Sequence, residues 1–343
     1  MTDVQNDPRL DPRVKAILSM LVNTPETDVA SRDELLEAVN EPEAVAMREA
    51  LEGALDLVDD ETIAPSAGLD IRTVEIESHP DGNTIKLQVI RPEGDEQLPC
   101  VYYIHGGGMA TLSCYLGMYR SWGRMIAHRG VCVVMVEFRN STTPSAVPEV
   151  APFPAGLNDC ISGLRWVTEH AAELHVDPDR VIVAGESGGG NLTLATGMKL
   201  LRDGSIGMIR GLYALCPYIA GRYPHEDFPS TVENNGILLE LHNNRGLMGY
   251  GIEHFDDKNP LAWPSFATED DVRGLPPTVI SVNECDPLRD EGIAFYRLLL
   301  AAGVPARGKM MLGTMHGQEI VSIACPDVSA DTALAIADFA RTI

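Results

Sequence analysis

Residues 181–191 read Val-Ile-Val-Ala-Gly-Glu-Ser-Gly-Gly-Gly-Asn and carry the strongest signal in the chain. An apolar, β-branched run breaks into glycines, and residues 192–195, Leu-Thr-Leu-Ala, then suit a helix. This order predicts a strand, a sharp turn and a helix. A Gly-x-Ser-x-Gly turn at such a junction lifts the serine hydroxyl clear of the sheet, because the glycines carry no side chains that would block it. We interpret Ser187 as a nucleophile rather than as part of a glycine-rich surface turn.

The composition indicates a globular chain with a large core and a strongly acidic surface. Its 343 residues, 45% of them hydrophobic, suffice for one large α/β domain with an accessory element. The formal net charge of -24 at pH 7 would repel phosphate backbones and anionic membrane surfaces. We therefore expect no nucleic acid and no membrane among its partners.

The 7 cysteines are scattered, lie mostly in apolar runs and include no Cys-x-x-Cys pair. They are typical of reduced thiols in a protein core. The sequence also contains no signal-peptide pattern and no long apolar span. These features predict a cytoplasmic chain without a membrane anchor.

Beyond the first 65 residues, short apolar strands alternate with helices. Strand patterns cover 72–77, 84–90, 99–104, 131–137, 181–185, 209–216, 277–282 and 306–311. Helical patterns lie near 118–129, 157–170, 190–202, 289–301 and 329–341. The turn sequence at 79–83 predicts a hairpin, with the first two strands antiparallel. The alternation indicates an α/β fold with an eight-stranded, mainly parallel sheet flanked by helices on both faces.

The N-terminal segment 1–65 is acidic and helical in pattern. It contains an amphipathic run at 14–21, a capping-box start at Ser31 and a longer run over 42–58. A solvated appendage is one interpretation, but the apolar stripes need a surface to cover. A helical cap over a pocket is the alternative.

A second segment, 217–264, separates two strands by far more than an ordinary crossover. It includes a helical pattern over 236–248. We interpret it as a cap insertion on the ligand side of the sheet rather than as a disordered loop. The α/β core then consists of two parts, 66–216 and 265–343.

Residues 101–108, Val-Tyr-Tyr-Ile-His-Gly-Gly-Gly, end a strand in three glycines. Backbone N–H groups without neighbouring side chains can approach a substrate oxygen closely. Gly107, Gly108 and the residue after the nucleophile, Gly188, are the predicted donors of an oxyanion hole. His105 is expected to pack the loop.

A serine of ordinary pKa needs a base, and the base needs an orienting carboxylate. Asp286 and His316 each follow a late strand, in the order serine, acid, histidine. Ligands bind at the carboxyl ends of strands in open α/β sheets. The sequence therefore predicts Ser187, Asp286 and His316 as the catalytic residues. Asp290 falls where a helix begins, and we expect it to act on the helix dipole.

Four segments together resemble the hormone-sensitive-lipase-like branch, of the bacterial family IV type, of the α/β-hydrolase carboxylesterases. They are His-Gly-Gly-Gly at 105–108, Gly-Glu-Ser-Gly-Gly-Gly-Asn at 185–191, Asp-Pro-Leu-Arg-Asp-Glu at 286–291 and His-Gly at 316–317. The resemblance covers residue 70 to the end and puts the N-terminal helices in the place of that family's cap. It implies the α/β-hydrolase fold and ester hydrolysis through an acyl-enzyme, without cofactor or metal, and suggests a homodimer.

The function expected from these observations is a serine esterase acting on a small-molecule ester. The acidic, polar texture of the two cap segments favours an enclosed pocket, and hence short- to medium-chain carboxylic esters. The sequence departs from the family's usual residues at Glu186 and Gly188, where Asp and Ala are common, and at Gln318, where Phe is common.

Two other classes of protein are alternatives to the esterase. A nucleotide-binding α/β protein would hold phosphate with these glycines, but the turn lacks the Lys-Ser/Thr ending and the Gly-x-Gly-x-x-Gly pattern. A non-catalytic small-molecule-binding protein on the same fold is the other alternative. Retention of Ser187, Asp286 and His316 argues against it.

Overall fold

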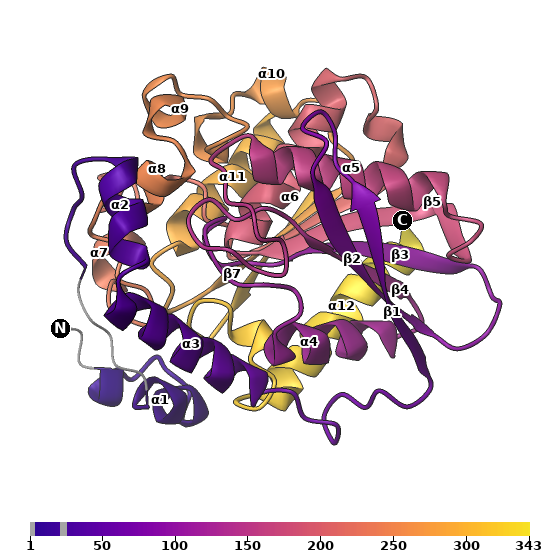
Figure 1. Ribbon diagram of the computed structural model, residues 1–343, viewed down its shortest axis with the longest axis horizontal. Helices are drawn as coiled ribbons and strands as arrows, with labels where there is room; N and C mark the ends of the chain where they lie inside the picture. The colour runs from indigo at the N-terminus through magenta and orange to yellow at the C-terminus, as the bar shows by residue number, and fades with distance from the viewer. Residues whose placement is uncertain (1–3, 21–25) are drawn as a thin grey trace.

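One eight-stranded sheet runs through the computed structural model, which describes residues 4–20 and 26–343 (Figure 1). Its strands are β1 (Leu69–Glu77), β2 (Thr84–Pro92), β3 (Leu98–Ile104), β4 (Cys132–Glu137), β5 (Val176–Glu186), β6 (Gly211–Leu215), β7 (Thr278–Asn283) and β8 (Ala306–Met311). In space they follow the order β1-β2-β4-β3-β5-β6-β7-β8. β2 pairs antiparallel with both of its neighbours, and the remaining pairs are parallel. The predicted α/β fold and the antiparallel first hairpin are confirmed.

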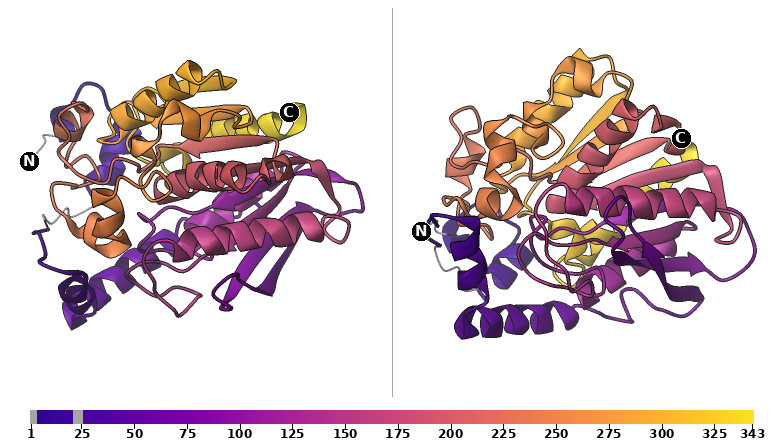
Figure 2. Two further views of the ribbon diagram at one scale, coloured as in Figure 1. Left: turned by 90° about the horizontal axis from the view of Figure 1, so that it is seen from above. Right: turned by 45° about the horizontal axis from the view of Figure 1, so that its top comes forward.

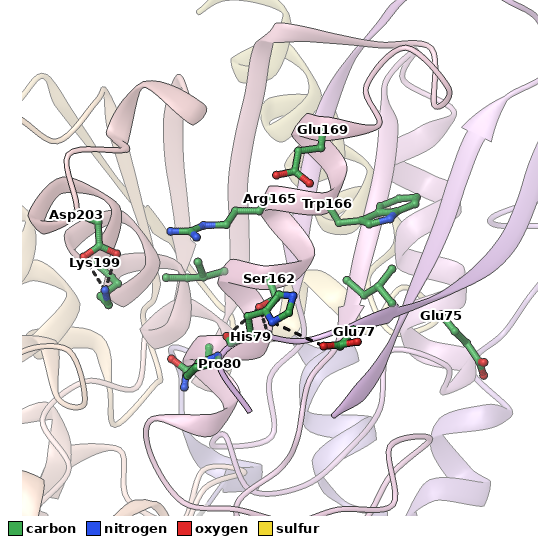
Figure 3. Close-up of a pocket in the computed structure, with 13 residues that line it drawn as sticks. Glu75, Glu77, His79, Pro80, Ser162, Arg165, Trp166, Glu169, Lys199 and Asp203 are labelled. Carbon is green, nitrogen blue, oxygen red and sulfur yellow. Dashed lines mark hydrogen bonds and ion pairs between the residues drawn. The ribbon is translucent and has the colours of Figure 1, made fainter. Parts of the chain in front are cut away.

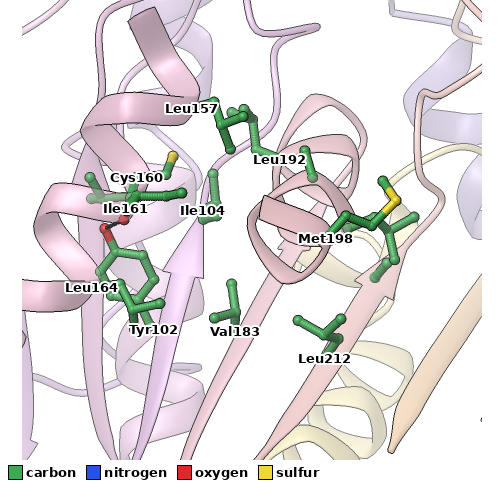
Figure 4. Close-up of a cluster of buried hydrophobic side chains, with 14 of the residues drawn as sticks. Tyr102, Ile104, Leu157, Cys160, Ile161, Leu164, Val183, Leu192, Met198 and Leu212 are labelled. Carbon is green, nitrogen blue, oxygen red and sulfur yellow. Dashed lines mark hydrogen bonds between the residues drawn. The ribbon is translucent and has the colours of Figure 1, made fainter. Parts of the chain in front are cut away.

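The central strands are apolar because helices cover both faces of the sheet. Every residue of β4 and β7 is buried. One face packs against α5 (Ala155–Glu169), α6 (Gly188–Arg202) and α11 (Arg289–Ala301). Figure 4 shows part of this layer, with the labelled side chains Tyr102, Ile104, Leu157, Cys160, Ile161, Leu164, Val183, Leu192, Met198 and Leu212. The other face packs against α4 (Gly117–Ala127) and α12 (Pro326–Thr342).

The N-terminal segment forms η1 (Val4–Asn6), α1 (Pro12–Leu18), α2 (Arg32–Val39) and α3 (Pro42–Asp56). The end of the predicted run over 14–21 lies outside the described residues. The Ser31 hydroxyl accepts the Glu34 N–H at 3.1 Å, which gives α2 the predicted N-cap. In Figure 1, α2 lies beside α8 (Arg245–Tyr250), and two Val29–Asn244 hydrogen bonds join these segments.

The insertion at 217–264 carries α7 (Ser230–Glu233), α8 and α9 (Ile252–Asp256), and it ends where η3 (Pro264–Phe266) begins. The prediction of a helix over 236–248 is wrong, because α8 begins only at Arg245. The Asn235 side chain accepts the Leu241 N–H at 2.9 Å, and the Glu240 carboxylate accepts the His242 N–H at 3.1 Å. Such side-chain to backbone bonds compete with helical ones.

The remaining short elements join the strands without changing the layers. They are η2 (Ile206–Met208), α10 (Glu269–Val272) and η4 (Gln318–Ile320). Figure 2 shows the N-terminal helices and the insertion gathered at one end of the sheet. Among the described helices, none is both long and apolar enough to cross a membrane.

Candidate active site

Ser187 occupies a sharp turn between β5, which ends at Glu186, and α6, which begins at Gly188. Its φ of 56° lies in the left-handed region, where a non-glycine residue is strained. Two hydrogen bonds of 3.0 Å hold this backbone, one from the Ser187 N–H to the Leu215 carbonyl and one from the Tyr218 N–H to the Ser187 carbonyl. The turn is therefore fixed from the end of β6.

The glycines of this turn are required by the close approach of neighbouring backbone. A Cβ on Gly189 would collide with the Ile104 carbonyl at the end of β3. A Cβ on Gly188 would lie 2.5 Å from the Met109 nitrogen and 2.8 Å from the Gly108 nitrogen. The first turn of α6 and the glycine loop after β3 thus touch through their backbones.

Asp286 and His316 meet beyond the ends of β7 and β8. The His316 Nδ1 lies 2.8 Å from the Asp286 Oδ2, and both side chains are buried. The other carboxylate oxygen of Asp286 accepts the Leu288 N–H at 2.8 Å. Burial alone favours the neutral imidazole, but the Asp286 carboxylate and the Cys216 side chain together outweigh it and raise the pKa of His316 above its ordinary value. The pair therefore stabilises an imidazolium.

Ser187 is half-buried, and among the described residues its hydroxyl forms no hydrogen bond with His316. Catalytic hydrogen bonds are often long or misaligned before substrate binds, so this geometry is compatible with the pair.

Asp290 has a different set of partners from Asp286. Its carboxylate accepts the Ser230 N–H at 2.7 Å and pairs with Arg289 at 2.9 Å, which joins α7 to α11.

The glycine loop after β3 is held by a buried carboxylate that the sequence did not single out for this role. The Glu186 Oε1 accepts the Gly106 N–H at 2.6 Å and the Tyr119 hydroxyl at 2.5 Å. The Oε2 accepts the Tyr103 hydroxyl at 2.6 Å. Burial raises the pKa of Glu186 to about 7, although the three donors oppose that change. The residue before the predicted nucleophile thus fixes the first glycine of the loop.

The two predicted loop donors both adopt positive φ, 92° at Gly107 and 62° at Gly108. The His105 ring lies beneath them, fully buried and stacked on Phe138 with ring centroids 4.3 Å apart. This placement leaves the imidazole no access to substrate.

A third titratable side chain, Cys216, directly follows β6 and lies beside the Asp286–His316 pair. Its Sγ, a ring nitrogen of His316 and a carboxylate oxygen of Asp286 all lie within 4.8 Å of one another. In the described part of the chain this is the group of His, Cys, Asp and Glu side chains that could hold a metal ion. The sequence had placed all seven cysteines in the core, and they are indeed free and buried.

A surface cavity of about 640 Å³ lies elsewhere, between the β1–β2 hairpin and the helices α5 and α6 (Figure 3). Acidic and basic side chains line it, among them Glu77, Arg165, Glu169 and Lys199. None of the predicted catalytic residues contributes to its wall.

Comparison with known proteins identifies the family of this chain. Residues 101–319 match the family described as the alpha/beta hydrolase fold. Carboxylesterase NlhH of Mycobacterium tuberculosis is 31% identical over 253 residues, which are 72% of this chain and 75% of that protein. The arylesterase of Saccharolobus solfataricus is 30% identical over 63% of this chain and 67% of its own length.

Solved structures extend the similarity to the whole chain. Esterase Est22 is 62% identical, with a TM-score of 0.98 and complete coverage of both chains. Brefeldin A esterase, described as a bacterial homologue of human hormone sensitive lipase, is 36% identical with a TM-score of 0.85. That match covers 99% of this chain and 96% of the other.

Proposed function

This chain belongs to the hormone-sensitive-lipase-like branch of the α/β-hydrolase family and is a carboxylic ester hydrolase, from which we propose that Ser187, Asp286 and His316 are its catalytic triad. The observation that carries the proposal is the buried 2.8 Å Asp286–His316 bond at the same edge of the sheet as the strained Ser187 turn. No relative favours the alternative of a non-catalytic binding protein.

The proposed reaction proceeds by acyl transfer to water. His316 removes the Ser187 proton, and the serine oxygen attacks the ester carbonyl. The N–H groups of Gly107, Gly108 and Gly188 donate hydrogen bonds to the oxyanion. The close contact between α6 and the glycine loop brings these donors together. Asp286 keeps the imidazole in the required tautomer and stabilises its charged form. Water then repeats the sequence on the acyl-enzyme.

For the substrate, we propose esters of acyl groups with about two to eight carbons, because each buried methylene helps only until a closed pocket is filled. Residues 1–65 and 217–264 would form the cap, with 66–216 and 265–343 as the core. Packing of Leu10 and Val14 with Met315, directly before His316, supports a cap near the site. A structure of Est22 contains p-nitrophenol, the alcohol part of p-nitrophenyl esters.

A cytoplasmic homodimer is part of the same proposal. The free, buried cysteines suit a reducing compartment. The edge strand β8 has mostly exposed side chains, and Leu312 directly after it is 72% exposed, which leaves this edge available for a second copy.

The test is Ser187→Ala, assayed with p-nitrophenyl esters of graded chain length and with a fluorophosphonate probe. We expect turnover and labelling to disappear while the fold, checked by circular dichroism, survives. Ser205→Ala, a serine away from the site, is the matched control and should be labelled like the wild type. Full labelling of the Ser187 variant would refute the assignment, and equal rates on long-chain triglyceride emulsions would refute the chain-length proposal alone.

A further inference from the structure

Cys216 has a position that the esterase reaction does not use. β6 lies between β5, which carries the nucleophile turn, and β7, which leads to Asp286. The first residue after β6 is therefore brought next to the acid and the base. Its φ of 34° is in the left-handed region, and its side chain is fully buried.

The geometry points to an inhibitory binding site for a borderline or soft divalent cation such as Zn²⁺ or Cd²⁺, formed by Cys216, Asp286 and His316. A thiolate, an imidazole nitrogen and a carboxylate oxygen are the ligands that proteins offer to zinc. The three ligand atoms lie within 4.8 Å of one another, so small side-chain movements bring them to bonding distance. The expected inhibition rests on the proposed triad, whereas the expected metal binding does not.

Binding exchanges protons for metal bonds and involves no oxidation. The Cys216 S–H bond breaks, its proton goes to water, and the sulfur keeps the electron pair that bonds the cation. If Nε2 of His316 is the second ligand, its lone pair can no longer accept the Ser187 proton. If Nδ1 is the ligand, the ring proton moves to Nε2 and the bond to Asp286 is lost. Both arrangements remove the general base.

Access and charge favour the same cations. Ser187 is half-buried and His316 is 6% exposed, so these two residues are the parts of the site that reach solvent. The net charge of -24 concentrates cations around the molecule. Three protein ligands leave a fourth position for water, as in open zinc sites. Mg²⁺ and Ca²⁺ prefer oxygen ligands and should bind here poorly.

The binding arm of the test uses the Ser187→Ala variant, which keeps all three ligands. We expect Cd²⁺ titration to produce the ultraviolet thiolate-to-cadmium charge-transfer band with one equivalent of metal. The double variant Ser187→Ala, Cys216→Ala should lack the band. The double variant with Cys285→Ala is the matched control, because that thiol belongs to a separate buried cluster with Leu10 and Val14, and it should keep the band. A band that persists without Cys216 would overturn the site.

The activity arm uses the wild-type enzyme and Cys216→Ala with p-nitrophenyl acetate. We expect Zn²⁺ to inhibit the wild type reversibly, with recovery after chelation. Loss of one ligand should raise the half-inhibitory concentration by about 100-fold or more in Cys216→Ala. Equal inhibition of both proteins, or equal inhibition by Mg²⁺, would overturn the proposal. A Cd²⁺ band without loss of activity would overturn the inhibitory role and count against His316 as the base.

Discussion

The end of the sheet that carries the proposed triad and the N-terminal helix α3 are held to the protein in different ways. Around the nucleophile, the buried Glu186 accepts three hydrogen bonds, and the buried Asp286 orients His316. By contrast, α3 has no buried residue, and its Met47 is 66% exposed. Near its C-terminal end, the Asp56 carboxylate accepts the Gly117 N–H at 2.7 Å and pairs with Arg120 at 3.5 Å.

Under the proposed function, this difference separates the groups that do chemistry from those that control access. A site built from mutually bonded buried groups cannot shift one member without disturbing the others. A helix held by a few surface contacts can be altered at small cost. Substitutions at the sheet edge should therefore change turnover or stability, and substitutions in the N-terminal helices should change mainly substrate preference.

The largest expected effect is at Asp286. Asp286→Asn keeps the shape but favours the wrong imidazole tautomer, so kcat should fall by about 10⁴-fold. Asp290→Asn is the matched control, because Asp290 bonds to Ser230 and Arg289, and it should lose less than about tenfold. Steady-state kinetics on p-nitrophenyl butyrate measures both. The reverse ranking would transfer the role of the acid to Asp290.

Glu186 should make stability depend on pH. Its pKa is about 7 in the folded protein against the ordinary 4.5, so the folded state binds more protons between these values. The contribution of Glu186 to the free energy of unfolding should then fall as pH rises from 4.5 to 7, by about 3 kcal/mol at most, and level off above pH 7. Glu186→Gln retains the hydrogen-bonding shape and should flatten that fall in denaturant titrations.

The control for this experiment is Glu49→Gln on the exposed side of α3, which should leave the pH profile unchanged. A second buried carboxylate contributes in the same direction, since burial raises the pKa of Glu291 to about 8. The Glu186 variant should therefore retain part of the slope. An unaltered profile in Glu186→Gln would contradict the assignment of the slope to this residue.

Next in size is Gly188→Ala, which installs the family's common residue. The new Cβ would press on the backbone nitrogens of Met109 and Gly108, so the glycine loop must move away from the nucleophile. A displaced oxyanion donor should lower kcat by about 10- to 100-fold with little change in KM. Gly53→Ala, with open space around a helical glycine of α3, should leave kcat unchanged and add up to about 1 kcal/mol of stability. If Gly188→Ala kept the wild-type kcat, the contact between Gly188 and the glycine loop would not be needed for turnover.

Local patterns in the sequence sufficed to predict most of the fold and to propose the catalytic residues. Apolar strands, helical periodicity and the glycine turn are properties of short segments, which explains why the eight strands could be placed. The partners of Glu186 could not be found this way, because Tyr103 and Tyr119 come from β3 and α4 and meet the carboxylate only in the folded sheet. The position of Cys216 likewise follows from the order of β5, β6 and β7, and that order is set by tertiary pairing.

The smallest expected effect is at the contact between α2 and the insertion. Leu35 is buried, and a Cβ on Gly249 of α8 would lie 3.3 Å from its Cδ2, so this side chain joins the two predicted cap segments. Leu35→Ala should loosen that contact and raise KM for p-nitrophenyl hexanoate about threefold, which corresponds to roughly 0.7 kcal/mol of binding free energy. The kcat for p-nitrophenyl acetate should stay unchanged, since no group at the sheet edge is touched. Leu36→Ala, on a less buried position of the same helix, should leave both constants as they are. If Leu35→Ala instead lowered kcat for acetate, the N-terminal helices would be part of the catalytic framework, and the contrast between the two regions would fail.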